Sequence, residues 1–377
     1  MVYFYTEVGL NPLQMVLVGT ALETSILAFE IPTVIVADSL SRRKSVIIGV
    51  FLLGAGTVLF GLIPRFWVII LAQIIWGLGY TFTSGALEAW ISDEVGEEHT
   101  GAIFLHGTRV SQYGWLAAIP LSVLLAQTRL TTPIFASGGL FWLLGFYLIL
   151  YMPETGFHPL PRQGRNNWQQ MLLIFHGGLG MLRQRPVLVN ILLIGLFFGL
   201  YSEGYDRLWN AHILEQFTFP RLPGLQMITW FGIIEAASRL LILLAVRPVE
   251  KRTDSSQIHH LVRWQAVLSV ALLLSLLLFA LAGNLWLTIS AVLAIGVLRE
   301  MIWPLYLAWV NHRIDPQVRA TVLSMSGQVD SLGQIISGPL LGSIVNRFGI
   351  RYGLLGSVLI LFPVIPLLIT QLRNNQE

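Results

Sequence analysis

Long apolar runs recur along this chain from near its beginning to near its end. A helix needs about 20 residues to cross about 30 Å of membrane hydrocarbon. Hydrophobic residues make up 55% of the chain and charged residues only 11%, where an average soluble protein has about 25% charged residues. The sequence therefore predicts an all-α integral membrane protein with eleven complete spans, at roughly 12–36, 45–63, 66–92, 100–126, 131–152, 186–207, 224–247, 260–282, 284–311, 317–345 and 350–371.

The start of the chain predicts part of a further helix, and the residues and motifs missing from the sequence exclude several kinds of site. Residues 1–7 are rich in aromatic side chains and are typical of the last turns of another helix, so we expect the end of a first transmembrane helix there. The chain has no cysteine, which excludes disulfides and thiolate metal sites. It has no P-loop, zinc-type histidine pair or Gly-x-Ser-x-Gly motif, so neither ATP coupling nor hydrolysis is indicated. We expect no enzyme, no cofactor and no metal site.

The two halves of the chain resemble each other. A Leu-Gln-Met triplet at 13–15 is followed eight residues later by Glu23, and the same triplet at 225–227 is followed eight residues later by Glu235. Internal duplication of a helical bundle is a common plan of secondary transporters. We therefore expect an N-terminal bundle at 1–152, a connecting loop at 153–185 and a C-terminal bundle at 186–377.

The basic residues predict the orientation. Fourteen lysines and arginines fall on the side of the loop that follows the first complete span, and five fall on the opposite side. By the positive-inside rule the richer side is cytoplasmic, and it includes the C-terminus. The formal charge of +3 therefore reports topology rather than nucleic-acid binding.

Charged residues inside the spans are distributed unevenly. The spans 45–63, 131–152 and 350–371 carry none within their apolar cores, and 260–282 carries only Arg263 at one end. An ionisable side chain at membrane depth is costly unless it faces protein or water, so these four spans should face lipid. The other spans should line or brace a cavity, and their charged residues are Glu23, Glu30, Glu88, Arg109, Glu203, Asp206, Arg207, Glu235, Arg239, Arg299, Glu300 and Asp330.

The loop after the first complete span carries a short motif. Asp38 is followed four residues later by Arg42, with Arg43 next to it. When the end of a helix at residues 1–7 is counted as the first helix, the four spans expected to face lipid are the third, sixth, ninth and twelfth. Together with the loop motif and the two-half repeat, this spacing makes the chain resemble the major facilitator superfamily. The resemblance covers essentially the whole chain and implies twelve helices in two pseudo-symmetric halves that move a small solute by alternating access.

The resemblance also implies a role for this motif. In the family, the acidic and basic residues of this loop hold the cytoplasmic side shut, so Asp38, Arg42 and Arg43 become gating candidates. The family's glycines are replaced here by Val34 and Ser41. The alternative is a short basic turn that only sets topology.

Two glutamates occupy equivalent places in the repeat. Glu23 and Glu235 fall near the middle of their spans. The charged form of a carboxylate is disfavoured in a low-dielectric cavity, so such a group can take up and release a proton. The alternative for Glu235 is structural, because Arg239 follows four residues later at the spacing of an intrahelical ion pair.

Further charged residues need partners. Arg299 and Glu300 are adjacent, so their side chains diverge by about 100° on a helix and pair poorly. We expect Asp330 to pair with Arg299, which would leave Glu300 facing the cavity. Glu300 and Asp330 are further candidates for transport and proton coupling, beside the two glutamates of the repeat. Glu88 and Arg109 lie on successive antiparallel helices and are expected to form a structural salt bridge.

A last charged group lies where the span 186–207 is expected to end. Glu203, Asp206 and Arg207 stand there beside aromatic residues. They predict either an outer vestibule or an interfacial cap, and the sequence does not separate the two.

These features favour a monomeric, multi-pass transporter of the cytoplasmic membrane. We expect proton-coupled efflux of a hydrophobic or cationic compound, because acidic residues outnumber basic ones within the spans and aromatic residues suit cations. The partners are then a small-molecule substrate, protons and the lipid bilayer, with no nucleic acid. One alternative is an importer or facilitator of a polar nutrient. Another is a non-transporting membrane scaffold.

Overall fold

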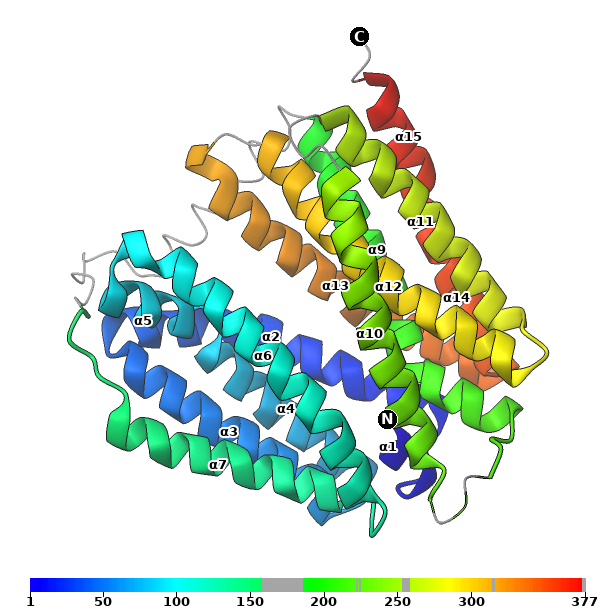
Figure 1. The fold of residues 1–377 in the computed structure, drawn as a ribbon, viewed down its shortest axis with the longest axis horizontal. Coiled ribbons are helices and arrows are strands. Elements are labelled where there is room, and N and C mark those ends of the chain that lie inside the picture. Colours follow the sequence, from blue (N-terminus) through cyan, green and yellow to red (C-terminus); the bar gives the residue numbers. More distant parts are fainter. Residues whose placement is uncertain (158–185, 222, 224, 253–257, 314–315, 375–377) are drawn as a thin grey trace. The chain divides into compact units, whose positions relative to one another are not determined.

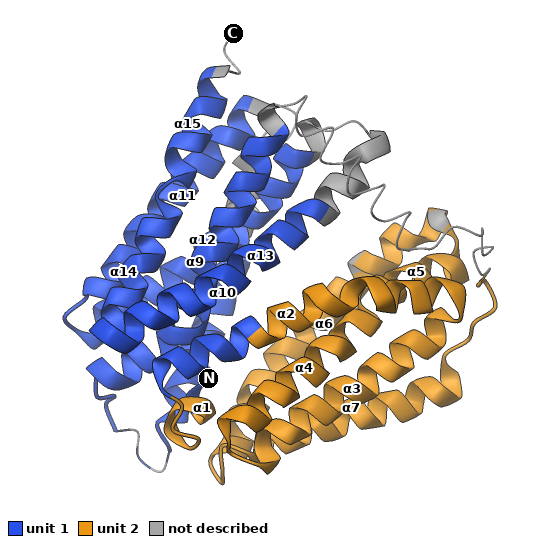
Figure 2. Cartoon of the chain, turned by 180° about the vertical axis from the view of Figure 1, so that it is seen from behind, with its two compact units in different colours: residues 1–2, 11–20, 171–377 blue, residues 3–10, 21–170 orange. Residues whose placement is uncertain are grey.

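The computed structural model describes residues 1–157, 186–221, 223, 225–252, 258–313 and 316–374, and every regular element among them is an α-helix (Figure 1). Helices suit a membrane because each satisfies its own backbone hydrogen bonds. The chain divides into two compact units (Figure 2). Unit 1 contains residues 1–2, 11–20 and 171–377, and unit 2 contains residues 3–10 and 21–170.

Unit 2 is built from the helices of the first half of the chain. Gly85 and Gly96 have φ angles of +72° and +81°, and they separate α4 from α5 and α5 from α6. The left-handed backbone that ends these helices favours glycine. The helices are the short α1 (Val2–Thr6), most of α2 (Pro12–Ser39), α3 (Arg42–Leu62), α4 (Phe66–Thr83), α5 (Ala86–Val95), α6 (Glu97–Ala126) and α7 (Thr132–Tyr151).

Helix α3 packs against both α4 and α7. The contact with α4 depends on two glycines, since a Cβ atom at Gly49 would lie 2.7 Å from the carbonyl oxygen of Gly79. A small apolar core joins α3 to the ends of α2, α5 and α7, and its buried members are Ala37, Val46, Val50, Ala86 and Met152. The backbones of unit 2 therefore approach closely, as is usual for membrane helices.

Unit 1 contains the helices of the second half. Helix α9 packs against α13 and α14, and α11 packs against α12, α14 and α15. Pro363 lies between α14 and α15, where its missing N–H and fixed ring interrupt the helix. The bounds are α9 (Pro186–Gln216), α10 (Ile228–Arg252), α11 (Ile258–Leu281), α12 (Leu285–Arg313), α13 (Pro316–Phe348), α14 (Ile350–Leu361) and α15 (Val364–Asn374).

The helices confirm an all-α protein with many membrane spans. Within the described residues, nine segments are long and apolar enough to cross a membrane. Helices α6 and α13, with 30 and 33 residues, have the length but are more polar. The expected number of eleven complete spans therefore stays a prediction.

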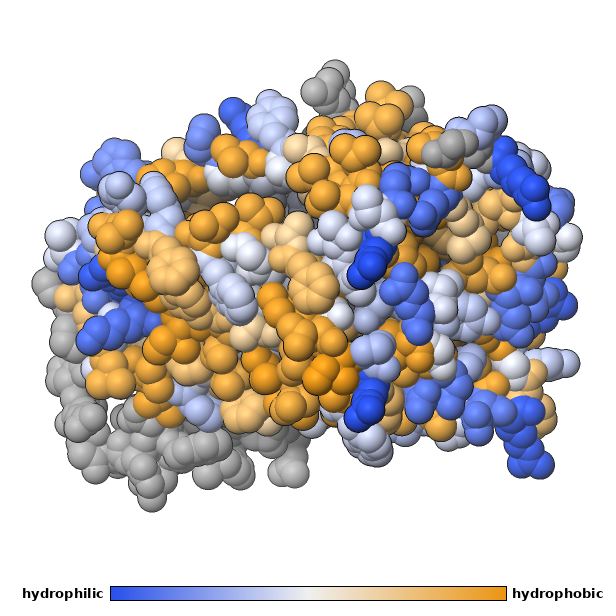
Figure 3. Space-filling model, turned by 90° about the horizontal axis from the view of Figure 1, so that it is seen from below, coloured by the Kyte–Doolittle hydropathy of each residue, from blue (hydrophilic) through white to orange (hydrophobic). Residues whose placement is uncertain are grey.

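The outward-facing side chains of several helices are apolar. Leu143, Phe146 and Leu150 of α7 are exposed, as are Leu274 of α11 and Leu359 of α14. Figure 3 shows large hydrophobic areas on one face of the molecule. These exposed apolar side chains agree with the expectation that the helices face lipid, and α7 is less buried than α3, α11 or the segment Ile350–Arg373.

The division into units does not test the expected bundle boundaries. Residues 11–20, at the start of α2, belong to unit 1 although the rest of that helix belongs to unit 2. Most of the expected connecting loop, residues 158–185, lies outside the described residues. The boundaries at 1–152 and 186–377 therefore stay a prediction.

Candidate functional site

A cavity of about 550 Å³ lies inside unit 1, between α9, α10, α12 and α13. Its lining combines charged and aromatic side chains to an extent that is unusual for membrane helices, where ionisable residues are rare. The charged residues are Asp206, Glu235, Arg239, Arg299, Glu300 and Asp330, and the aromatic residues are Phe198, Tyr201, Tyr205, Trp209, Trp303 and Tyr306.

One pair in the cavity is held by two hydrogen bonds. Arg299 of α12 donates from Nη2 to Oδ2 of Asp206 at 2.9 Å and from Nη1 to the other carboxylate oxygen. Its guanidinium carbon lies 5.9 Å from the ring centroid of Tyr201 and 5.8 Å from that of Tyr205. Bidentate pairing and two aromatic contacts together fix this side chain between α12 and α9.

This pairing corrects the expectation that Arg299 pairs with Asp330. Asp330 instead accepts a hydrogen bond from Nε2 of Gln334 at 2.9 Å. The expectation failed because α9 was expected to end at residue 207, which put Asp206 at a membrane surface. The helix continues to Gln216, so Asp206 lies well inside the span and faces Arg299.

A second arginine contacts two carboxylates. Nη2 of Arg239 lies 3.3 Å from Oε1 of Glu235, one turn earlier on α10, and Nη1 lies 3.4 Å from Oε1 of Glu300 on α12. The intrahelical pair of Glu235 and Arg239 expected from the spacing is thus present. Glu300 lines the cavity as expected, but it also contacts this arginine.

The longer α9 also places the three charged residues that the sequence predicted as either an outer vestibule or an interfacial cap. Glu203 is fully buried, and its Oε1 accepts a hydrogen bond from Nε of Arg207 at 3.0 Å. A Cβ atom at Gly19 would overlap this pair, so the start of α2 lies directly against it. Glu203 and Arg207 therefore brace helices within unit 1 rather than forming an outer entrance, and Asp206 belongs to the cavity.

The remaining candidates lie in unit 2. Within the described residues no ion pair joins Glu88 to Arg109, and both side chains are exposed. Glu88 lies eight residues before the turn at Gly96, and Arg109 lies thirteen residues after it. On two antiparallel helices this difference of five residues offsets the two side chains by about 7.5 Å along the helix axes. Glu23 is half-buried on α2 and makes a polar interaction.

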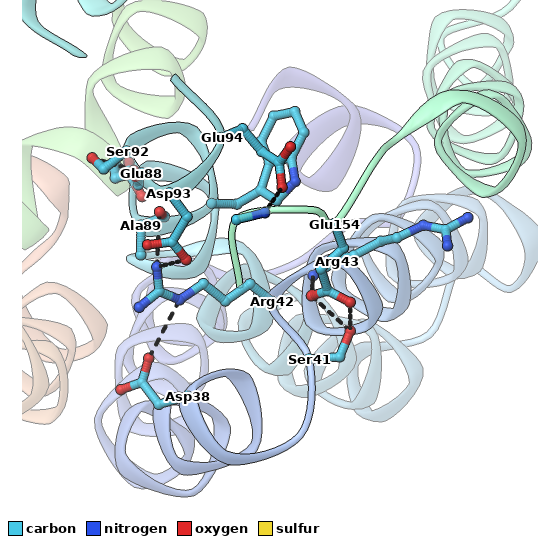
Figure 4. A network of polar contacts seen from close by, with 12 residues as sticks. Asp38, Ser41, Arg42, Arg43, Glu88, Ala89, Ser92, Asp93, Glu94 and Glu154 are labelled. Atoms are coloured by element: carbon cyan, nitrogen blue, oxygen red, sulfur yellow. Dashed lines mark hydrogen bonds and ion pairs between the residues drawn. The ribbon is translucent and has the colours of Figure 1, made fainter. Parts of the chain in front are cut away.

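The motif at the turn between α2 and α3 forms a network of ion pairs and hydrogen bonds (Figure 4). Arg42 contacts Asp38 at 3.7 Å, pairs with Asp93 of α5, and donates a hydrogen bond of 2.8 Å to the carbonyl oxygen of Ala89. Arg43 donates from Nη2 to the carbonyl oxygen of Ile149 at 2.6 Å. The turn is therefore tied to the ends of α5 and α7.

The segment after α7 adds contacts that sequence reasoning missed. Glu154 accepts hydrogen bonds from Oγ of Ser41 at 2.8 Å and from the backbone N–H of Arg43 at 2.9 Å. Glu94 accepts them from the backbone N–H groups of Thr155 and Gly156 at 2.6 and 2.9 Å. The sequence signal that could have revealed the contacts of Glu94 was the acidic run around this residue, which has no basic neighbour in the sequence and therefore needs partners elsewhere.

The comparison with known families decides what kind of protein this is. The family described as Major Facilitator Superfamily matches residues 1–337. The chain belongs to the major facilitator superfamily. This confirms the resemblance drawn from the loop motif and the repeat.

Individual relatives agree with this membership. The chain is 23% identical over 359 residues to the "Uncharacterized MFS-type transporter YxaM" of Bacillus subtilis (strain 168), covering 94% of this chain and 86% of the relative. Among solved structures, a nucleoside transporter NupG has a TM-score of 0.77 at 15% identity, covering 98% of this chain and 93% of that one. A D-xylose-proton symporter has a TM-score of 0.66 at 15% identity, covering 96% and 90%.

Membership of the major facilitator superfamily assigns the general function. The protein is a multi-pass membrane protein of a secondary transporter family, and members of this family are generally not enzymes. A small-molecule substrate follows from the family. The structural relatives share too little sequence with this chain to transfer their substrates.

Proposed function

We propose that this protein exports an organic cation in exchange for protons by alternating access. The observation that carries the proposal is the charge of the cavity in unit 1. Its lining contains four carboxylates, Asp206, Glu235, Glu300 and Asp330, but only two arginines. With all six ionised, two negative charges are in excess, and in a low-dielectric surrounding such an excess attracts cations.

The aromatic lining supports a substrate with an apolar or aromatic part. Trp303 and Tyr306 stack with ring centroids 5.7 Å apart and planes 23° apart. The face of an indole or phenol ring attracts cations and also packs against flat apolar groups. A cavity of about 550 Å³ falls within the usual range for drug-sized ligands.

Asp330 is the favoured site for the coupling proton. Its hydrogen-bond partner, Gln334, is neutral, and within the described residues Asp330 forms no ion pair. The other three carboxylates of the cavity each contact an arginine. A proton neutralises Asp330 without breaking an ion pair, so protonation there disturbs the cavity least.

Gating is assigned to the α2–α3 turn network, defined as Asp38, Ser41, Arg42, Arg43, Asp93 and Glu154. Its contacts tie the ends of several helices of unit 2 together. In this proposal, some of these contacts break and form again as the cytoplasmic side opens and closes. The proposal places this network on the cytoplasmic side, in agreement with the distribution of basic residues.

Proton-linked efflux can be tested in inverted membrane vesicles. Adding N-methylquinolinium, a flat organic cation, should dissipate an imposed proton gradient reported by a pH-sensitive dye. Asp330→Asn should abolish this response. Glu215→Gln, which changes an exposed carboxylate at the end of α9 outside the cavity, should retain it.

A second candidate function is uptake of a polar, ring-containing nutrient. Asp330 and Gln334 together present an acceptor and an amide to the cavity, and the stacked Trp303 and Tyr306 could receive a flat ring. Structural relatives include a nucleoside transporter and a sugar symporter. Uptake of uridine or D-xylose that persists after the proton gradient is collapsed, with no response to N-methylquinolinium, would favour this function. Transport of none of these compounds would favour a non-transporting scaffold.

A further inference from the structure

The two arginines of the cavity are held in different ways. Arg299 makes a bidentate bond to Asp206 and stands against two tyrosine rings. Arg239 reaches Glu235 and Glu300 at 3.3 and 3.4 Å, which are long distances for charge-assisted hydrogen bonds. A cation that enters the cavity will therefore compete with Arg239 more readily than with Arg299.

The two carboxylates at Arg239 are not equivalent. Glu235 lies one helical turn before Arg239 on α10, so the helix itself keeps these two side chains together. Glu300 belongs to α12, and its contact with Arg239 is the one that a movement of either helix breaks. The side chain of Glu300 is 50% exposed, against 41% for Glu235 and 40% for Asp206.

An aromatic platform lies beside Glu300. Trp303 follows three residues later, so both side chains project from the same side of α12. Trp303 lines the cavity and is 51% exposed. Its ring stacks on the ring of Tyr306, which is buried. A large aromatic face left open beside an accessible carboxylate suits a ligand that joins a positive charge to a flat ring.

We infer that Glu300 and Trp303 form the recognition site for the substrate, and that the substrate's cationic group takes the place of Arg239 at Glu300. Arg239 then remains with Glu235, and the flat part of the substrate rests on Trp303. The substrate class is a planar aromatic cation. This inference rests on the proposed function, because it gives residues and a chemical class to the same cavity.

The exchange has a consequence for the helices. Arg239 and Glu300 link α10 to α12, whereas the pair of Arg239 and Glu235 lies within α10. Replacing Arg239 by a substrate cation removes that link while every charge keeps a partner. Substrate binding would thus remove this ion pair between α10 and α12 at little electrostatic cost.

Equilibrium binding to the purified full-length protein tests this inference. The probes are N-methylquinolinium, which is permanently charged, and quinoline, which has the same ring system and is neutral at mildly alkaline pH. Glu300→Gln should lower the affinity for the cation roughly tenfold or more and leave the affinity for quinoline unchanged. Trp303→Ala should lower the affinity for both. Glu215→Gln should alter neither.

Arg239→Gln provides the sharpest readout. Because Arg239 competes with the substrate at Glu300, its removal should raise the affinity for N-methylquinolinium by several-fold, a gain that a misfolded variant does not produce. Unchanged cation binding in Glu300→Gln, or a loss in Arg239→Gln, would overturn the exchange but leave the proposed function standing. Absence of cation binding in the unmodified protein would overturn both.

Discussion

Substitution of Gly199 by alanine is expected to destabilise unit 1 and to disturb the cavity. Gly199 lies on α9 where this helix meets α13. A Cβ atom there would lie 2.1 Å from the carbonyl oxygen of Asp330, 2.8 Å from its carbonyl carbon and 2.9 Å from its Cα. All three neighbours are backbone atoms, so none can rotate away. Accommodating the methyl group requires α9 and α13 to separate.

The size of this movement follows from the contact distances. Since a methyl carbon and an oxygen rarely approach within about 3.2 Å, the helices must separate by about 1 Å. Overpacking of this kind costs about 1–3 kcal/mol. The helix propensity of alanine returns about 1 kcal/mol at most, so the net effect is destabilising. Asp330 moves with its backbone, so transport should fall as well.

A thermal-shift assay in detergent measures this effect. The apparent Tm of Gly199→Ala should fall by a few degrees, on the order of 2–4 °C. Gly327→Ala is the matched control, because it is also on a helix of this contact and a Cβ atom there would meet nothing within 4 Å. The control should be as stable as the unmodified protein or slightly more stable. If both alanine variants unfold at the same temperature, the close approach of α9 and α13 at Gly199 is refuted.

Two other predictions concern the ion pairs. Arg299→Asp and Asp206→Arg should each abolish transport, and combining the two substitutions should restore part of it. Combining Arg299→Asp with Asp330→Arg should restore none. Vesicle transport measurements compare these four variants, and rescue only by the exchange with Asp330 would contradict the observed pairing. Glu154→Gln should lower the free energy of unfolding by about 1–2 kcal/mol, because it weakens two charge-assisted hydrogen bonds of the α2–α3 turn network. Thermal unfolding checks this against Glu98→Gln, whose side chain is 83% exposed, and equal stability of the two variants would argue against a structural role for Glu154.

Element ends were predicted less well than the elements themselves. Apolar runs predicted the presence of α9 but ended it at residue 207, nine residues before its observed end at Gln216. The charged residues at 203–207 suggested a membrane surface. They are tolerated inside the span because Glu203 pairs with Arg207 and Asp206 with Arg299. Arg207 stands four residues after Glu203, at a spacing that the sequence displays, whereas nothing near Asp206 in the sequence marks Arg299 as its partner.

Local spacing predicted some pairs and missed others. The bond between Glu235 and Arg239 followed from their separation of four residues, because a helix brings such positions together. The pairs of Arg299 with Asp206 and of Arg42 with Asp93 join residues that are 93 and 51 positions apart. Pairs of this kind depend on which faces of two helices meet.

The sequence by itself determined that this protein is a helical membrane protein of two related halves and a member of a transporter family. Those properties follow from the length and polarity of successive segments, since each helix in a membrane must satisfy its own backbone hydrogen bonds along its whole length. Only the tertiary structure decided that Arg299 pairs with Asp206, that Arg239 contacts both Glu235 and Glu300, and that Trp303 lines the same cavity as Glu300. The rotation of each helix about its axis sets these contacts, and that rotation is fixed by close packing between helices rather than by any one segment.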